Sequence, residues 1–310
     1  MKRGKKFFSF ILAFTILLTL SFNLTYADED DNDPVKFVVK GRQSAADMAK
    51  YRGQMVYQQE QLLNGEIRTR SDCPSNHYSI INGDDRTRLK TTINQIAFIM
   101  IKYKGVSELN YATGFYAAPG KLLTVAHAVI GKKGDKEIEW ATAYFFLNIP
   151  NSNEYQVASS PIYNAYVTKY YQRHLSKKND YAVLRLAGEI YLNPTTRLAP
   201  LKLAKPNELS TYAKLFPYVC GFPDARIHPC IQHSGGGFLN DEPGNRYYYN
   251  IDIEPGQSGS PIFVRDANNQ IVVIGIHTDG KGINYSPHPD LNSGLKLRTE
   301  IHEFLAGCPW

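Results

Sequence analysis

The chain has 310 residues, of which 43% are hydrophobic, 21% charged and 12% aromatic. This composition is that of a globular protein with enough apolar side chain for a sizeable core, and it excludes a disordered, collagen-like or coiled-coil protein. The 23 Gly, 17 Pro and 21 Tyr residues favour turns and strands over long helices. The net charge of +6 is partly carried by the first six residues and does not indicate a nucleic-acid partner.

The N-terminus has the pattern of a secretory signal peptide. Residues 1–6 are basic, residues 7–20 are almost wholly apolar, and Thr25 and Ala27 place small residues before an acidic run. The apolar stretch is short for a membrane anchor, and no later segment is long enough to span a membrane. We therefore expect cleavage after Ala27, secretion to the extracellular space, no membrane contact afterwards, and a monomer.

Residues 28–78 differ from the rest of the chain, because polar and charged residues are abundant there and apolar residues are sparse. Only residues 45–63 show a weakly amphipathic helical pattern. This change of composition distinguishes residues 28–78 from the part of the chain that follows.

After Ile93, short apolar and β-rich runs recur between turn signals. They predict strands over residues 96–103, 113–117, 122–125, 141–147, 181–186, 215–219, 247–253, 261–264 and 271–276. Strands at this spacing are typical of all-β barrels or sandwiches and disfavour alternating β and α units. Leu297, Ile301, Phe304 and Leu305 then repeat at helical spacing, which predicts one closing helix.

The four cysteines are too few for a scaffold built on disulfides. Because export favours disulfides, we expect Cys220 and Cys230, which enclose a stretch with Pro and Gly, to bridge a hairpin. Cys73 and Cys308 have no clear partner. A metal site at Cys230 and its neighbouring histidines fits no strong zinc spacing, so no metal or cofactor is expected.

Three segments carry residue types that need one another in nucleophilic catalysis. His127 ends a β-rich run, Asp180 precedes an apolar strand, and residues 255–261 (PGQSGSP) place Ser258 between glycines. A serine hydroxyl needs a base, and the histidine needs a carboxylate that fixes its tautomer. We predict that these three residues are catalytic. The glycines let the N–H groups of Gly256 and Ser258 turn toward one point, which predicts an oxyanion hole.

The order His, Asp, Ser and the local motifs resemble the chymotrypsin clan of serine peptidases, and within it the bacterial glutamyl endopeptidases. Four stretches carry the resemblance: residues 79–88 (SIINGDDRTR), the His127 segment, residues 256–261, and residues 275–280 (GIHTDG). The resemblance implies an all-β fold of two six-stranded barrels with a C-terminal helix, and a protein or peptide substrate.

The resemblance also implies a secreted preproenzyme. Its parts are a signal peptide at 1–27, a propeptide at 28–78, a first barrel at 79–195, and a second barrel with the helix at 196–310. The resemblance implies that the new N-terminus at Ser79 helps to shape the specificity pocket and binds substrate.

In glutamyl endopeptidases, a histidine placed after the serine hairpin binds the glutamate side chain of the substrate. His277 fits that position, and an imidazole can donate a hydrogen bond to a carboxylate. The resemblance further implies that Thr278 and Gly280 pair with the substrate backbone as a short added strand. These residues predict cleavage after Glu or Asp.

Three residues depart from related patterns. Ile253 stands where the family often has a hydroxyl side chain, and Glu254 would repel an acidic substrate if it faced the pocket. Gln257 replaces the aspartate that pairs with the new N-terminal amine in trypsin-like digestive enzymes. Activation should therefore not depend on that ion pair.

Two alternative hypotheses are compatible with the same sequence. The chain could be a catalytically silent secreted binding protein on the same fold, or a serine endopeptidase of non-acidic specificity. An α/β-hydrolase esterase is disfavoured, because such enzymes place the serine before the acid and the histidine in the chain. Tyr170, Tyr171 and His174, just before Asp180, either line the cleft or lie in a surface loop, and the loop is the expectation.

Overall fold

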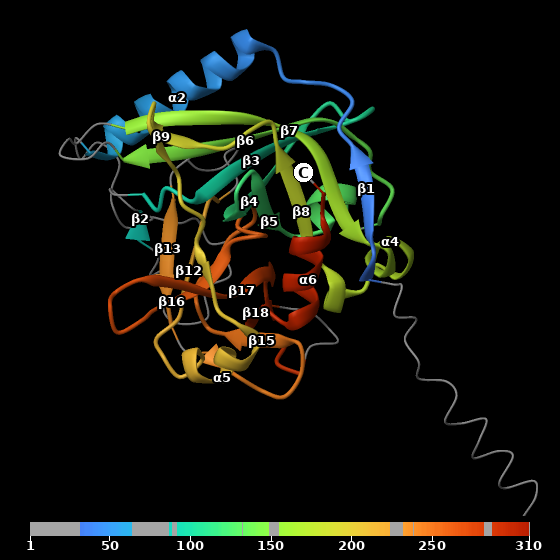
Figure 1. The fold of residues 1–310 in the computed structure, drawn as a ribbon, viewed down its shortest axis with the longest axis vertical. Helices are drawn as coiled ribbons and strands as arrows, with labels where there is room; N and C mark the ends of the chain where they lie inside the picture. Colours follow the sequence, from blue (N-terminus) through green and yellow to red (C-terminus); the bar gives the residue numbers. More distant parts are fainter. Residues whose placement is uncertain are drawn as a thin grey trace, which may run out of the picture.

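The computed structural model describes residues 32–63, 87–88, 92–131, 133–148, 155–223, 232–237, 239–281 and 287–309. The expected signal peptide lies outside the described residues, as do Ser79, Cys73 and Cys230. The described residues form two large β-sheets that pack together and a separate two-stranded sheet, with most helices at the periphery (Figure 1). In this part of the chain, no helix is both long and apolar enough to cross a membrane.

The first sheet closes into a barrel. Its strands are β1 (Pro34–Val38), β3 (Ile96–Tyr103), β4 (Leu109–Ala118), β5 (Lys121–Thr124), β6 (Ile138–Asn148), β7 (Tyr155–Thr168) and β8 (Ala182–Leu186). They pair in the order β1-β7-β6-β3-β4-β5-β8, and a further pairing of β7 with β8 closes six of them into a ring. The expected first six-stranded barrel is therefore confirmed, and β1 adds an unexpected strand at its outside.

Strand β7, which the sequence did not predict, changes partner halfway along its length. Its first half pairs with β6 as far as Pro161 opposite Thr142, and its second half pairs with β8 from Ile162 opposite Leu186. Proline lacks a backbone donor and is confined to sites where a ladder is interrupted. Pro161 lies where β7 stops pairing with β6 and begins to pair with β8. The proline that argues against a strand in the sequence therefore stands at the position where the strand changes partner.

The second sheet is longer and open. Its strands are β2 (Thr87–Arg88), β11 (Lys202–Leu203), β12 (Tyr218–Gly221), β13 (His233–Gly236), β14 (Leu239–Asn240), β15 (Arg246–Tyr249), β16 (Pro261–Arg265), β17 (Ile271–Asp279) and β18 (Asn292–Lys296). They pair in the order β14-β15-β18-β17-β16-β12-β13-β2, with β11 beside β17. Over the described ranges this path does not close, so the second unit is a half-barrel. Strands β9 (Tyr191–Asn193) and β10 (Thr196–Arg197) form a separate hairpin.

The helices are few. They are α2 (Ala45–Leu63), α3 (His127–Ile130), α4 (Lys169–His174), α5 (Leu209–Tyr212), α6 (Thr299–Gly307) and the 3-10 turns η2 (Lys177–Asn179) and η3 (Pro206–Glu208). Helix α2 begins where expected, because the hydroxyl of Ser44 accepts a hydrogen bond from the backbone N–H of Asp47 at 3.0 Å. Helix α6 confirms the closing helix and buries Ile301, Phe304 and Leu305.

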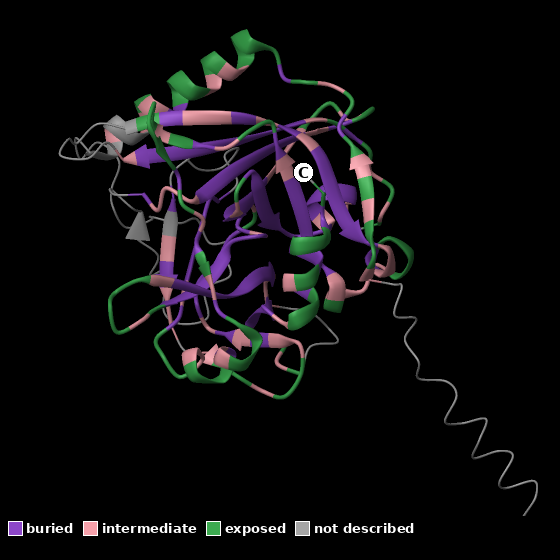
Figure 2. Ribbon diagram, in the orientation of Figure 1, coloured by how far each residue is buried: buried purple, intermediate pink, exposed green. Residues whose placement is uncertain are grey.

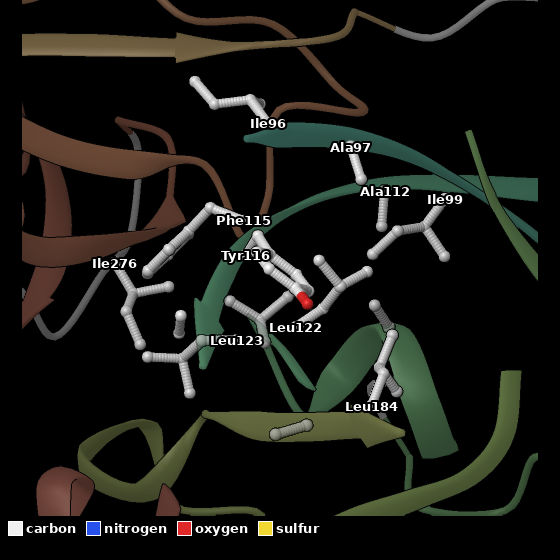
Figure 3. Packing of buried hydrophobic residues seen from close by; sticks show 14 of the residues in the cluster. Ile96, Ala97, Ile99, Ala112, Phe115, Tyr116, Leu122, Leu123, Leu184 and Ile276 are labelled. Atoms are coloured by element: carbon white, nitrogen blue, oxygen red, sulfur yellow. The ribbon is translucent and has the colours of Figure 1, made fainter. Parts of the chain in front are cut away.

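One hydrophobic core extends through both sheets. Figure 2 shows buried residues concentrated on the inner strands and exposed residues on α2 and the loops. Ile276 of β17 belongs to the same buried cluster as Phe115 and Leu123 of the first barrel, and Figure 3 shows these side chains in one packed region. Because apolar burial is the main stabilising term of a fold, this shared core fixes the two sheets against each other.

The cysteine expectation was wrong for Cys220. Cys220 is a buried free thiol, and its Sγ lies 3.7 Å from Oε1 of Gln232, so the structure does not contain the expected bridge to Cys230. The side chain points into the core from strand β12. Cys308 is also a buried free thiol. Burial raises the pKa of the Cys308 thiol to about 12.

Helix α6 follows the second sheet but is attached to the first barrel. The ammonium of the buried Lys121, on β5, donates to the backbone oxygens of Leu305 at 3.1 Å and Cys308 at 2.6 Å. The rings of Phe304 and Tyr181 also pack edge to face, with centroids 5.3 Å apart. The last carbonyls of a helix lack partners within the helix, so Lys121 satisfies groups that would otherwise be buried unpaired.

We expect Lys121→Met to lower the free energy of unfolding by about 2 kcal/mol, because it leaves these carbonyls without their donor. Urea denaturation measures the change. Lys202→Met is the matched control, since the Lys202 side chain is 48% exposed. Equal stability of the two variants would show that Lys121 does not hold the helix.

Candidate active site

An antiparallel strand pair brings His127 and Asp180 together. Strands β5 and β8 pair with Thr124 opposite Ala182, so the end of β5 lies beside the start of β8. His127 comes three residues after Thr124, and Asp180 comes two residues before Ala182. The strand register therefore closes a long separation in sequence.

The contact between these two residues is double. Oδ2 of Asp180 lies 2.7 Å from Nδ1 of His127, and Oδ1 accepts the backbone N–H of His127 at 2.9 Å. The Asp180 side chain is 5% exposed and the His127 side chain 14% exposed. A carboxylate at Nδ1 holds the proton on that nitrogen, which leaves Nε2 as the basic nitrogen of the ring.

Asp180 has a second partner, Tyr171, which no sequence motif indicated. Tyr171 is buried in helix α4, not in a surface loop as expected, and its side chain hydrogen-bonds Asp180. Burial and the nearby charges of Asp180 and Asp279 raise the pKa of the Tyr171 hydroxyl, so it stays protonated. Thr168 caps the helix by accepting the N–H of Tyr171 at 3.0 Å. An aromatic residue close to Asp180 in sequence was the only available signal.

The segment that carries Ser258 is a tight turn held from both sides. The N–H of Gly259 donates to the backbone oxygen of His277 at 2.8 Å, and the oxygen of Ser258 accepts the N–H of Thr113 at 2.9 Å. Thr113 lies on β4 of the first barrel, and its hydroxyl donates to the oxygen of Gly256 at 3.0 Å. The first barrel therefore holds the turn that belongs to the second.

Gly259 is required at its position for two reasons. Its φ is +90°, which side-chain-bearing residues rarely adopt. A Cβ there would also lie 2.1 Å from the oxygen of Thr113 and 2.2 Å from the hydroxyl of Thr124. Only a glycine can approach the first barrel this closely.

His127 and Ser258 line one cavity of about 290 Å³. The other lining residues come from β3, β4 and the segment around α3: Ile101, Tyr103, Asn110, Tyr111, Ala112, Ala128, Gly131 and Lys136. The structure has no hydrogen bond between Oγ of Ser258 and the ring of His127. Within the described part of the chain, the N–H groups of Gly256 and Ser258 donate to no protein acceptor.

His277 lies beside the serine turn but is buried. The backbone N–H of His277 donates to the backbone oxygen of Ser260 at 2.8 Å. Its ring nitrogen Nδ1 lies 2.5 Å from the hydroxyl of Tyr249. The ring also hydrogen-bonds the backbone of Ser293, and the residue is only 2% exposed. Burial lowers the pKa of His277 to about 4, so its imidazole is neutral at pH 7.

A charged cluster that no motif indicated joins the two sheets near Asp180. Asp279, at the end of β17, binds Nζ of Lys177 at 2.8 Å and the guanidinium of Arg246 at 2.7 Å. Arg246 also donates to the oxygen of Lys177 at 3.0 Å. Burial alone raises the pKa of Asp279, but attraction to Arg246 and Lys177 outweighs it and holds the pKa below its usual value. The cluster fixes the turn that leads into Asp180.

The remaining described residues that the sequence analysis singled out do not line the cavity. Thr278 is buried, with its hydroxyl 3.0 Å from Oδ2 of Asp279, and Gly280 follows β17 in a half-buried position. Ile253 and Glu254 are buried and do not line the cavity. Over the described residues, no group of three or more His, Cys, Asp and Glu side chains is arranged to hold a metal ion.

Comparison with known proteins finds a matching family model, a related protein and similar solved structures. The model of the trypsin-like peptidase domain matches residues 112–276. The extracellular metalloprotease of Bacillus subtilis (strain 168) is 26% identical over 232 residues, which cover 72% of this chain and 67% of that protein. A solved structure of Glu endopeptidase in complex with MPD is 24% identical, with a TM-score of 0.57 over 73% of this chain and 97% of that one. At this identity, the structural match shows a common fold.

We expect the buried His277 to make the protein acid-sensitive. An unfolded histidine binds a proton below about pH 6.5, whereas folded His277 does so only below about pH 4. Between these values the unfolded state binds more protons, so stability falls as the pH is lowered. The contribution is about 3 kcal/mol from pH 7 to pH 4.

Urea denaturation across this pH range should therefore give a flatter pH dependence for His277→Gln than for the wild type. His302→Gln, at a half-buried position on α6, should keep the wild-type profile. Identical profiles for all three proteins would contradict a neutral, buried His277.

Proposed function

The chain belongs to the trypsin-like peptidase family, and we propose that it is a secreted serine endopeptidase in which His127, Asp180 and Ser258 form the catalytic triad. The observation that carries the proposal is the contact between Asp180 and Nδ1 of His127 at 2.7 Å, at the edge of a cavity that Ser258 also lines. The match to the family model and the match to a solved structure confirm the resemblance to the chymotrypsin clan at the level of family and fold.

In the proposed first step, Oγ of Ser258 attacks the carbonyl carbon of the substrate while Nε2 of His127 accepts the hydroxyl proton. Asp180 holds the ring in the required tautomer and stabilises the imidazolium that forms. The N–H groups of Gly256 and Ser258, which have no protein acceptor among the described residues, would bind the developing oxyanion.

In the second step, the tetrahedral intermediate collapses to an acyl-enzyme. The scissile C–N bond breaks, and His127 returns its proton to the departing amine. Water then attacks the acyl group with His127 as the base, which releases the acid product and restores the Ser258 hydroxyl. Tyr171 is a positioning residue in this scheme, because it acts through Asp180.

Maturation and export form part of the proposal. Residues 1–27 would direct export, residues 28–78 would be cleaved from the chain as a propeptide, and residues 79–195 and 196–310 would form the two halves of a monomeric enzyme. The Bacillus relative is named an extracellular protein, which supports export. Its name also refers to a metal, but among the described residues no three His, Cys, Asp or Glu side chains are arranged to hold a metal ion, so no step is assigned to one.

We expect Ser258→Ala to lower kcat/KM for peptide hydrolysis by roughly 10⁴-fold or more, because it removes the nucleophile. Ser260→Ala is the matched control. The Ser260 hydroxyl is buried two residues away and has no hydrogen-bond partner in the described part of the chain. Steady-state kinetics with a fluorogenic peptide compare the two. If the processed wild type is inert as well, the alternative of a silent binding protein is supported.

Specificity for glutamate is the second part of the proposal. It rests on two observations. His277 lies next to the serine turn, where its backbone N–H donates to the backbone oxygen of Ser260, and the fold is similar to that of a Glu endopeptidase. The burial of its ring and the contacts with Tyr249 and Ser293 favour the alternative of a non-acidic specificity, because both ring nitrogens already have partners.

Peptides that differ only at the cleaved position should separate these two specificities. With Glu preference, we expect kcat/KM for Glu to exceed that for the neutral isostere Gln by at least about tenfold, since a charge-assisted hydrogen bond contributes 1.5–3 kcal/mol. Asp, Lys and Leu complete the series. Equal rates, or a preference for Lys or Leu, would contradict the proposed role of His277 in specificity. Neither outcome would bear on the proposed triad.

A further inference from the structure

We propose that residues 32–63 remain bound to the enzyme after the propeptide is cut, as a non-covalent structural subunit. This inference rests on the proposed cleavage near residue 78. The segment contains β1 and α2, and for brevity we call residues 32–63 the strap. Figure 1 shows the strap running along the outside of the first barrel.

The strap continues the sheet of the first barrel. Strand β1 pairs with β7 from Pro34 opposite Thr168 to Val38 opposite Asn164. The ladder extends at both ends, because the N–H of Lys169 donates to Asp33 and the N–H of Val39 donates to Tyr163, both at 3.0 Å. Without β1, this part of β7 would expose an unpaired edge once the strand has left β6.

The strap also contributes buried side chains. Val39 and Met55 are 7% and 3% exposed and belong to the hydrophobic core. Gln43 is 4% exposed, and its Oε1 accepts the hydroxyl of Tyr144 on β6 at 2.7 Å. The guanidinium of Arg42 lies 4.6 Å from the ring centroid of Tyr163. These contacts pack the strap against the first barrel at the end of β1 and at one face of α2.

The strap reaches the elements on both sides of Asp180. Asp33 binds the first residue of α4, the helix that carries Tyr171. Oδ1 of Asn32 accepts the hydroxyl of Tyr181, the residue after Asp180, at 2.5 Å. Loss of the strap would therefore remove contacts that hold the segment around Asp180, the acid of the proposed triad. A retained strap would keep Asp180 in position in the mature enzyme.

The ladder supplies a matched pair of variants. Hydrogen-bonded and non-hydrogen-bonded pairs alternate in antiparallel sheets, and the pairs 33/169 and 39/163 are bonded. The N–H of Phe37 therefore points at β7, and the N–H of Val38 points away. Phe37→Pro removes a ladder donor and a half-buried ring, whereas Val38→Pro changes an exposed residue with no ladder donor.

The test uses the full chain with Ser258→Ala, so that it does not depend on peptidase activity. A recognition sequence for a site-specific protease is inserted between residues 64 and 78, and the folded protein is cut and passed through size exclusion. We expect the strap to co-elute with residues 79–310 and to separate only in denaturant. Phe37→Pro should weaken its affinity at least tenfold relative to Val38→Pro.

Because the cut is made after folding, any role of the strap during folding does not affect the outcome. A strap that separates in native buffer, or equal affinities of the two proline variants, would overturn the proposal. Failure of the Ser258→Ala activity test would leave this experiment unaffected, so the two proposals can fail independently.

Discussion

The antiparallel pairing of β5 with β8 is the constraint on which the site depends. It places His127 and Asp180 at adjoining strand ends, so the contact between them is a consequence of the barrel's hydrogen-bond register. A buried carboxylate is costly unless it is paired and hydrogen-bonded. Asp180 meets that condition with two bonds from His127 and one from Tyr171. The barrel thus tolerates a buried charge at the one place where the proposed chemistry needs it.

The second requirement is that the serine turn be seated against the first barrel. Thr113 binds the backbone of this turn with both its N–H and its hydroxyl, and the hydroxyl also accepts the N–H of Phe222 at 2.9 Å. Gly259 allows the close approach. The proposed nucleophile on the second sheet is therefore placed by a residue of the first, so neither sheet could form the proposed site alone.

The sequence predicted those features that depend on local pattern. Strand runs such as residues 96–103 and the helix at 45–63 have the predicted bounds, because period and propensity act over short distances. Strand β7 was not predicted, because a proline within a run argues against a strand. The structure shows that Pro161 stands where β7 changes its pairing from β6 to β8. Tyr171 and the pairing of Lys177 with Asp279 were missed for a related reason, since tertiary contacts across distant segments leave no periodic signal.

The surroundings of His277 limit how an acidic substrate could be recognised. Its imidazole is neutral at pH 7 because burial lowers the pKa to about 4, so attraction to a fixed positive charge on this ring is not available at that pH. A neutral ring can bind a carboxylate only by donating its single N–H. That nitrogen must first leave a partner, either Tyr249 or the backbone of Ser293. Recognition of glutamate would then replace one hydrogen bond of the ring by another. The binding free energy gained would be only the difference between the two hydrogen bonds.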